Sequence, residues 1–269
     1  MGQFLKSCLC QQAQLESPTF RQWHDQLFEP FQYHRKLWEY IYIVQALWER
    51  GMLQPGKRGL GFAVGREPLA AFFASKGCEV VATDLDADRA STLGWVDSGQ
   101  HAHNLEVLND RGICDPDLFR QQATFRPVDM NHIPKDLVGF DFCWSSCSFE
   151  HLGSIEKGKQ FVFNMTRCLN PGGVAVHTTE FNISSNDATL DNDPNVVIFR
   201  RKDINDVAAR LRSQGHRIDL DYQLGDGEID HIVEHPPFCE DYKQVRHLKC
   251  LLGGFVVTSI GLIIEIRKD

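Results

Sequence analysis

The stretch from Gly59 to Asp86 constrains the fold of this chain more than any other. It opens with Gly59 and Gly61, continues through a run rich in alanine and phenylalanine, and closes with a short apolar segment that leads to Asp84. Glycine lets the backbone turn tightly and approach a ligand closely, and the N–H groups that open the following helix favour an anionic group. The order of turn, helix, buried strand and acid predicts half of a nucleotide-binding βαβ unit.

The spacing of the glycines disfavours NAD as that nucleotide. The dinucleotide fingerprint needs its third glycine three residues after the second, but Val64 stands there and the next glycine is Gly65. A dinucleotide-dependent oxidoreductase is therefore the weaker alternative. A tight turn in an α/β domain that binds no ligand is the purely structural one.

Composition and charge fit one globular α/β domain with additions. The chain has 269 residues, of which 42% are hydrophobic and 24% are charged, and its net charge is -8. The negative charge argues against a surface dedicated to nucleic acid and favours a small neutral or cationic partner. The nine cysteines include no Cys-x-x-Cys pair, which disfavours a zinc site and predicts a reducing, cytoplasmic location.

No segment of the sequence has the pattern of a signal peptide or of a membrane span. The first 15 residues are too polar for a signal peptide. Phe255 to Ile266 is the most apolar run near the end, but a membrane helix needs about 20 residues, so we expect a strand there.

Residues 1–50 predict a helical extension ahead of the main domain. Leu37, Ile41 and Val44 recur at helical spacing and give one broad apolar face. Such a helix packs on the core or closes over a pocket, and both alternatives stay open. Residues 51–269 then form the main domain, with an insertion around 225–247 that is either a solvated loop or a wall of the substrate site.

Polar side chains follow three further predicted strands at the point where each strand ends. They are Asp129 after the first, followed by the apolar Met130; Ser145 and Ser146 and then Glu150 and His151 after the second; and Glu180 after the third. The carboxyl ends of parallel strands meet at one edge of a sheet, where open α/β sheets bind ligands. We therefore expect these residues to share one site, with a helix N-cap as the alternative role of Asp129.

This ordered set of features resembles the class I S-adenosylmethionine-dependent methyltransferases. The resemblance covers roughly residues 57–180 and rests on five motifs: Gly59-Leu-Gly61, Asp84, Asp129-Met130, the run from Phe140 through Ser146 to Glu150-His151, and Leu169-Asn-Pro-Gly-Gly-Val174. It implies a Rossmann-like α/β fold with helices on both faces of a seven-stranded sheet in the order 3-2-1-4-5-7-6. The sixth strand would be Arg217 to Tyr222, and the antiparallel last strand would be Phe255 to Ile266.

The resemblance also implies a cofactor, S-adenosyl-L-methionine, and a set of contacts to it. Gly59 and Gly61 would pass beside the methionine moiety, Asp84 would hold the ribose, Asp129 and Met130 the adenine, and Ser145 or Ser146 would line the sulfonium side. One departure matters, because Lys57 or Arg58 stands where the family has an acid before its first glycine. The contact to the amino group of the ligand is therefore left open.

Transfer of a methyl group to a hydroxyl requires a base, and His151, Glu150 and Glu180 are the candidates. His151 leads, because an imidazole titrates near neutrality, and a histidine that only packs or caps is the alternative. Some members of the family bind magnesium through a Glu-x-x-Glu-His motif. Cys147 replaces the first glutamate of that motif here, so we predict no metal site.

These features together predict a methyltransferase acting on the oxygen of a small hydroxylated molecule, such as a sugar or a glycosylated precursor. A less specific similarity, in His247-Leu-Lys249 and Thr258-Ser-Ile-Gly261, is to methyltransferases of polysaccharide and glycolipid biosynthesis. The alternatives are the oxidoreductase and a catalytically silent S-adenosylmethionine-binding protein. The acceptor atom and the oligomeric state are not predicted.

Overall fold

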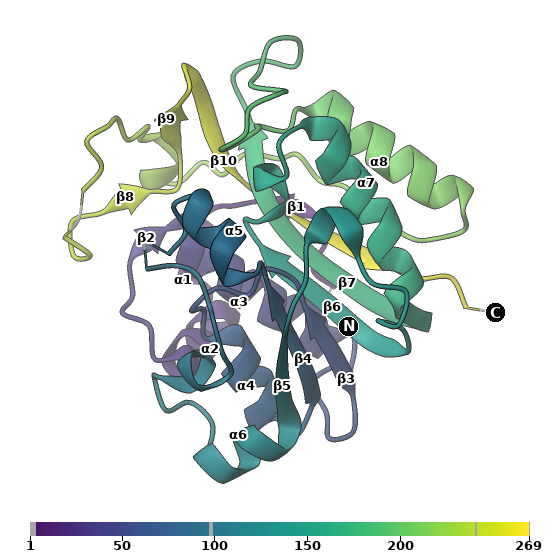
Figure 1. Cartoon of the computed structure of the whole chain (residues 1–269). Coiled ribbons are helices and arrows are strands. Elements are labelled where there is room, and N and C mark those ends of the chain that lie inside the picture. Colours follow the sequence, from purple (N-terminus) through teal and green to yellow (C-terminus); the bar gives the residue numbers. More distant parts are fainter. Residues whose placement is uncertain (1–3, 97–98, 240, 269) are drawn as a thin grey trace.

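The computed structural model describes residues 4–96, 99–239 and 241–268. Its main sheet has the strand order β5-β4-β3-β6-β7-β10-β1, and β9 pairs with β10 beside this path (Figure 1). The strands from β5 to β7 are parallel, whereas β10 is antiparallel to β7 and to β1. Their bounds are Cys8–Leu9 for β1, Arg58–Gly61 for β3, Glu79–Asp84 for β4, Ala123–Pro127 for β5, Phe140–Ser146 for β6, Leu169–Asn182 for β7, Cys250–Leu252 for β9 and Phe255–Glu265 for β10.

This is the Rossmann-like order predicted from the sequence, except at one edge. The antiparallel strand expected at Phe255 to Ile266 lies next to β7, as predicted. The prediction of a strand at Arg217 to Tyr222 was wrong. This segment makes only isolated bridges, one from Arg217 and one from Leu220. The edge position belongs to β1, which pairs with β10. Ser7, just before β1, forms backbone hydrogen bonds with Asp219 and Asp221 of this segment.

Helices cover both faces of the sheet (Figure 1). Side chains of a strand alternate between the two faces, so Phe142 and Trp144 of β6 enter the core beneath α3 and α4, while Cys143 enters the core beneath α7 and α8. The long helices are α3 at Arg35–Glu49, α7 at Ile155–Met165 and α8 at Arg201–Ser213. The others are α1 at Gln12–Glu16, α2 at Pro18–Leu27, α4 at Leu69–Ser75, α5 at Ala87–Thr92 and α6 at Pro116–Gln122.

Short elements connect these layers. The 3-10 turns are η1 at Glu106–Asn109, η2 at Met130–His132, η3 at Phe149–His151, η4 at Thr166–Cys168 and η5 at Ile229–His231. A second, two-stranded sheet joins β2, Tyr33–His34, in parallel to β8, Arg246–His247. It therefore ties the N-terminal extension to the insertion predicted around 225–247.

The N-terminal extension packs on the sheet through α3. Leu37, Ile41 and Val44 are buried as the helical spacing predicts, and α3 contacts β6, β7 and β10. Trp48 continues the same spacing but is 51% exposed. Because α3 begins at Arg35, directly after β2, its first turn lies above the carboxyl ends of β6 and β7. The domain boundary at residue 51 stays a prediction.

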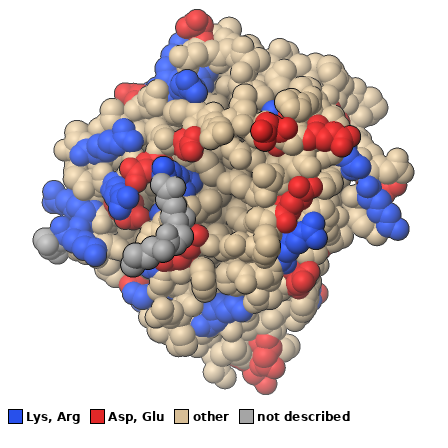
Figure 2. All heavy atoms as spheres, turned by 180° about the vertical axis from the view of Figure 1, so that it is seen from behind, with Lys and Arg blue, Asp and Glu red and all other residues tan. Residues whose placement is uncertain are grey.

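Charged side chains of both signs are interspersed on the face that Figure 2 shows, over the residues that the structure describes. None of the described helices is both long and apolar enough to pass through a bilayer.

Candidate active site

The glycine turn after β3 is built around aromatic packing. A Cβ atom on Gly59 would lie 2.3 Å from the ring of Phe142, and one on Gly61 would lie 2.5 Å from the ring of Trp144. Gly59 lies inside β3, so the structure gives both glycines a packing reason besides the expected close approach to a ligand. The turn itself follows the strand and ends at Gly65, which has a φ of +52° that suits glycine.

Asp84, at the end of β4, accepts a hydrogen bond from this turn. It is 7% exposed, and one carboxylate oxygen accepts from the N–H groups of Gly65 and Ala102, each at 3.1 Å. The other oxygen accepts from the N–H of Leu85 at 2.8 Å. Burial raises the pKa of Asp84, and these N–H groups act against that rise. A carboxylate has about four acceptor positions, so Asp84 keeps room for one ribose hydroxyl, and that role stays a prediction.

Asp129 has the alternative role that the sequence left open, because it caps η2. One oxygen accepts from the N–H of Asn131 at 2.9 Å, and the other accepts from Arg89 at 2.7 Å. Burial would raise the pKa of Asp129, but hydrogen bonds from His132 and Arg89 outweigh it and lower the pKa to about 2. Met130 follows inside η2 and is buried. Contact of either residue with adenine stays a prediction.

The two serines at the end of β6 face opposite sides of the sheet. Ser145 is buried, and its hydroxyl lies 2.8 Å from Nδ1 of His177. Ser146 points to the other side, where its hydroxyl donates to Glu39 on α3 at 3.0 Å and accepts from Lys36 at 2.9 Å. Of these two predicted residues, only Ser146 therefore joins the charged side chains that follow.

A cluster of buried and half-buried charged side chains lies at the carboxyl ends of β6 and β7. We call it the carboxylate cluster: Glu39, Glu67, Glu150 and Glu180, with Arg35 and Lys36. Arg35 lies 2.5 Å from Glu180, and Lys36 lies 2.7 Å from Glu67. Sequence reasoning predicted Glu150 and Glu180 but missed the residues from α3. The available signal was Glu39, a lone acid within an apolar run of the helix.

The cluster holds more carboxylates than cations. Burial therefore raises the pKa of those carboxyl groups whose charge the cations do not fully offset. Burial raises the pKa of Glu67, Glu150 and Glu180 to about 7 in each case. Burial acts in the same direction on Glu39, but Lys36 and Arg35 outweigh it and lower its pKa.

Three carboxylate oxygens of this cluster have no partner among the residues that the structure describes. They are Oε2 of Glu67, Oε1 of Glu150 and Oε2 of Glu180. Glu150 is fully buried, and Glu180 is 5% exposed. A buried acceptor without a partner costs about 1–3 kcal/mol, and more when it is charged. The arrangement therefore suits a ligand that brings positive charge or hydrogen-bond donors.

Cys147 brings a thiol beside two of these carboxylates. Ligand atoms of Cys147, Glu150 and Glu180 lie within 4.8 Å of one another, so these residues could hold a metal ion. Burial and the neighbouring carboxylates raise the pKa of the thiol, which donates to Glu39 at 2.9 Å. Metals bind the thiolate, and Arg35 already neutralises Glu180, so the donor set fits a metal poorly. The absence of a metal stays a prediction.

His151 lies in η3, next to Glu150. Its Nδ1 contacts the carbonyl oxygen of Asn195, which can only accept, so Nδ1 carries the proton and Nε2 keeps its lone pair. Burial lowers the pKa of His151, although Asn195 and Glu180 act against that shift. The imidazole is therefore neutral and able to accept a proton at Nε2, and the ring of Trp95 meets it edge to face at 4.6 Å.

The insertion around 225–247 adds a histidine pair close to the first turn of α3. His247 of β8 stacks on His34 of β2 at 4.6 Å, and Glu234 lies 2.5 Å from His247. Burial lowers the pKa of His247, and Arg35 lowers it further. This part of the insertion is therefore ordered against the N-terminal extension, and its role as a substrate wall stays a prediction.

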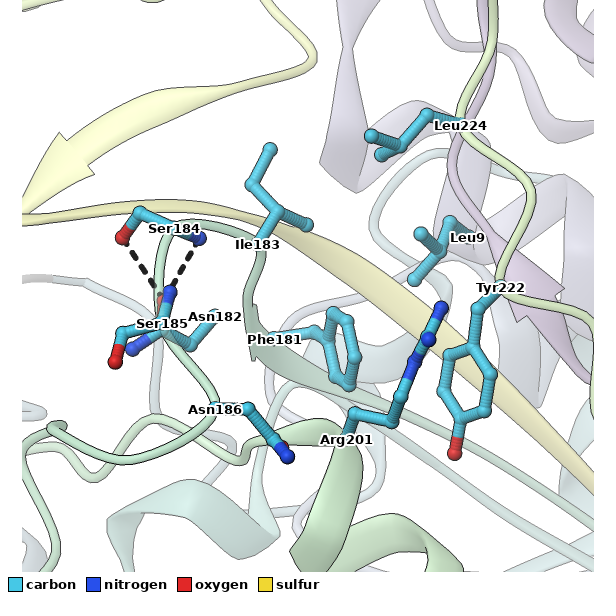
Figure 3. Close-up of a pocket in the computed structure, with 10 residues that line it drawn as sticks. All are labelled: Leu9, Phe181, Asn182, Ile183, Ser184, Ser185, Asn186, Arg201, Tyr222 and Leu224. Atoms are coloured by element: carbon cyan, nitrogen blue, oxygen red, sulfur yellow. Dashed lines mark hydrogen bonds between the residues drawn. The ribbon is translucent and has the colours of Figure 1, made fainter.

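A separate hollow of about 360 Å³ opens on the opposite side of β7 (Figure 3). Phe181 follows Glu180 and so points to the other face of the strand. Its ring stacks on Tyr222 at 5.6 Å, and the guanidinium of Arg201 lies 4.5 Å from the centre of the Tyr222 ring. None of the residues that line this hollow belongs to the carboxylate cluster.

Comparisons with known proteins give only distant likenesses. No protein-family model matches the chain, and no curated protein matches it. Among solved structures, the chain is similar to phosphoethanolamine N-methyltransferase 2 of Haemonchus contortus, with 19% identity, a TM-score of 0.43, and coverage of 61% of this chain and 34% of that one. It is also similar to a methyltransferase of Methanosarcina mazei, described as dependent on S-adenosylmethionine, with 13% identity, a TM-score of 0.48, and coverage of 82% and 97%.

A third likeness is to magnesium protoporphyrin IX methyltransferase of Synechocystis, solved with S-adenosylhomocysteine bound. It has 12% identity, a TM-score of 0.47, and coverage of 94% of this chain and 96% of that one. The chain thus spans about a third of the Haemonchus enzyme and nearly all of the other two. With identities and TM-scores this low, the likenesses carry no argument about the reaction. The functional argument therefore depends on the geometry of this chain.

Proposed function

We propose that this protein is an S-adenosylmethionine-dependent methyltransferase. The observation that carries the proposal is the carboxylate cluster beside the glycine turn, where three buried carboxylates and the half-buried Glu67 face two cationic side chains. S-adenosylmethionine carries a positive sulfonium and a positive ammonium group against one carboxylate. A ligand with net positive charge balances the cluster, whereas the negative pyrophosphate of NAD would add to its charge.

The residues of this chain fit such a donor at the edge of the sheet where open α/β folds bind ligands. The turn that ends at Gly65 and the carboxylate of Asp84 would hold the nucleoside part, and Ser146 would line the sulfonium side. When bound, S-adenosylmethionine supplies a methyl group that is already activated for transfer. The protein then has to orient the acceptor, exclude water and remove a proton.

We assign the proton to the pair formed by Glu150 and Glu180. Both have a free oxygen, and both have a pKa raised by burial to about 7, so the pair can take up one proton near neutral pH. Arg35 holds Glu180 in place through Oε1, whereas Oε2 is the oxygen without a partner among the described residues. His151, with its lone pair at Nε2, is the second candidate, and the pH dependence described below separates the two.

The acceptor that suits this pair is a small hydroxylated molecule, such as a sugar or a glycosylated precursor. Free carboxylate oxygens accept hydrogen bonds from hydroxyl groups, and two of them within one buried site can bind neighbouring hydroxyls of a polyol. Methylation would then occur on oxygen, with the released proton passing to Glu150 or Glu180.

The proposal is tested by incubating the protein with a metabolite extract and S-adenosylmethionine labelled in its methyl group, followed by mass spectrometry. We expect a labelled product in which chemical cleavage of ethers releases the labelled methyl group from oxygen. We expect the variant Glu150→Gln to abolish this product. Asp206→Asn, which removes an exposed partner of Lys159, is the matched control and should leave the product unchanged. Donor binding without any labelled product would instead indicate a catalytically silent binding protein.

A further inference from the structure

No acid stands immediately before the first glycine of the turn. Lys57 lies 3.1 Å from Asp141, and Arg58 lies 3.5 Å from Glu79. Both acids belong to the amino-terminal ends of β6 and β4, so these two cations lie at the edge of the sheet away from the carboxylate cluster. A cationic group of a ligand at the turn must find its counter-charge elsewhere.

Glu67 lies between the turn and α4 and offers that counter-charge. Its side chain is 11% exposed, and Oε1 lies 2.7 Å from Nζ of Lys36. Its second oxygen, Oε2, has no partner within the described part of the chain. Asp84 is the other acid at the turn, but its oxygens already accept three backbone N–H groups. Glu67 therefore presents the free carboxylate oxygen at this place.

Lys36 fixes the orientation of Glu67. Besides Glu67, its ammonium group donates to the carbonyl oxygen of Ser146 at 3.0 Å and to the hydroxyl of the same residue at 2.9 Å. These contacts use the three N–H groups of a lysine, so Lys36 holds one oxygen of Glu67 and leaves the other available. Glu39 lies 3.6 Å from Lys36 and also pairs with Arg35, whereas Lys36 is the cation paired with Glu67, so Glu67 can accept a second cation at its other oxygen.

We propose that Glu67 binds the ammonium group of the methionine end of the donor, and that Lys36 is its positioning residue. This inference rests on the proposed function, because it names a contact within the same donor site. The methionine end is the part of the donor with an ammonium group, and an ammonium bound to a carboxylate makes a charge-assisted hydrogen bond. It also gives the buried Oε2 of Glu67 a partner, which no residue in the described part of the chain supplies.

Two ligands separate this contact from the rest of the donor site. S-adenosylhomocysteine has the amino-acid end, and 5′-methylthioadenosine keeps the nucleoside and the sulfur without it. In titration calorimetry, Glu67→Gln should weaken the binding of S-adenosylhomocysteine about tenfold or more, the scale of a charge-assisted hydrogen bond. It should change the affinity for 5′-methylthioadenosine less than about twofold. Glu29→Gln is the matched control, since Glu29 is another largely buried carboxylate with one cationic partner, Arg111 at 2.8 Å. It should change neither affinity.

Equal weakening of both ligands by Glu67→Gln, or no weakening of either, would overturn the inference. Should Glu67→Gln fail to fold, Lys36→Gln gives the same comparison, because loss of the positioning residue should also weaken S-adenosylhomocysteine selectively. A different result would contradict the proposed function itself: the unaltered protein would bind neither S-adenosylhomocysteine nor 5′-methylthioadenosine. The inference about Glu67 would then be contradicted as well.

Discussion

Arg35 on α3 and Glu180 on β7 form an ion pair of 2.5 Å across 145 residues of sequence, at a point where both side chains are largely buried. The pair places a cation of the N-terminal extension inside the carboxylate cluster. It therefore makes α3 part of the proposed active site as well as a layer of the fold. The predictions below follow from this arrangement.

Removal of Arg35 should destabilise the protein strongly. Arg35→Met leaves Glu180 buried without its cation and removes one of the two cations of Glu39, and breaking a buried pair in this way costs about 3–5 kcal/mol. Urea unfolding measures this loss. Arg217→Met removes a pair with Asp219 in which both side chains are exposed, and it should change the urea midpoint far less than Arg35→Met does. Equal losses for the two variants would mean that the pair of Arg35 is not buried in solution.

The acid limb of the kcat/KM profile should identify the base, because kcat/KM reports the pKa values of the free protein. A base works only when it is deprotonated, so kcat/KM falls as the pH drops below its pKa. If Glu150 and Glu180 accept the proton, the limb lies near pH 7, because burial raises both pKa values to about 7. If His151 accepts it, the limb lies below the ordinary value of a histidine, because burial lowers its pKa.

Substitution of the same residues gives an independent comparison. Glu150→Gln should lower kcat by about 10² to 10⁴, the range for a positioned base, and leave donor affinity nearly unchanged. His151→Ala should keep more than about a third of kcat. The opposite ranking would return the role of base to His151 and reduce the carboxylates to binding groups.

The stability of the free protein should depend on the protonation of Glu150. A carboxyl group whose folded pKa is about 7 stabilises the folded state fully below its unfolded pKa of about 4.5, and this contribution is lost as the pH rises through 7. It amounts to roughly 3 kcal/mol at most. Thermal unfolding of the wild type and of Glu150→Gln, compared from pH 4.5 to 8, should therefore diverge as the pH rises. Parallel curves would mean that the group titrates normally.

Asp84 and Asp86 should differ in their effect on the donor. Asp84 accepts from the N–H groups of Gly65 and Ala102, and Asp84→Ala should weaken donor binding by roughly 1.5–3 kcal/mol. Asp86 caps α5 through the N–H of Arg89, so Asp86→Ala should cost about 1 kcal/mol of stability and little affinity. Equal effects on affinity in calorimetry would show that the donor does not contact the end of β4.

Activity should survive exhaustive treatment with EDTA. The thiol of Cys147 keeps its proton, because burial raises its pKa, and Arg35 pairs with Glu180. Loss of activity with EDTA, followed by recovery with magnesium, would show that Cys147, Glu150 and Glu180 hold a metal ion after all.

The sequence predicted the parallel part of the sheet because apolar segments that end in acids or serines mark strands and the edge at which they finish. It did not predict β1, since two residues, Cys8–Leu9, give no periodic pattern. Their place at the edge of the sheet is set by pairing with β10, which is distant in the sequence. Ser145 and Ser146 were indistinguishable in sequence. The register of β6 decides which of them faces α3.

The charged half of the site was harder to predict. Glu150 and Glu180 follow strands, so their position at the sheet edge was expected. Arg35 and Glu39 come from a helix whose apolar spacing indicates packing, and only the folded chain brings them to Glu180. Glu67 follows the glycine turn in sequence, but its free oxygen is a property of its partners and of its burial.

The most direct test of the account is titration calorimetry of the unaltered protein with S-adenosylhomocysteine and, separately, with NAD. Asp84 and Glu67 predict saturable binding of S-adenosylhomocysteine, which keeps the nucleoside and the ammonium group of the donor, at a 1:1 ratio. The carboxylates of the cluster predict no binding of NAD, whose pyrophosphate is negative. Saturable binding of NAD, without binding of S-adenosylhomocysteine, would contradict the account and favour the oxidoreductase.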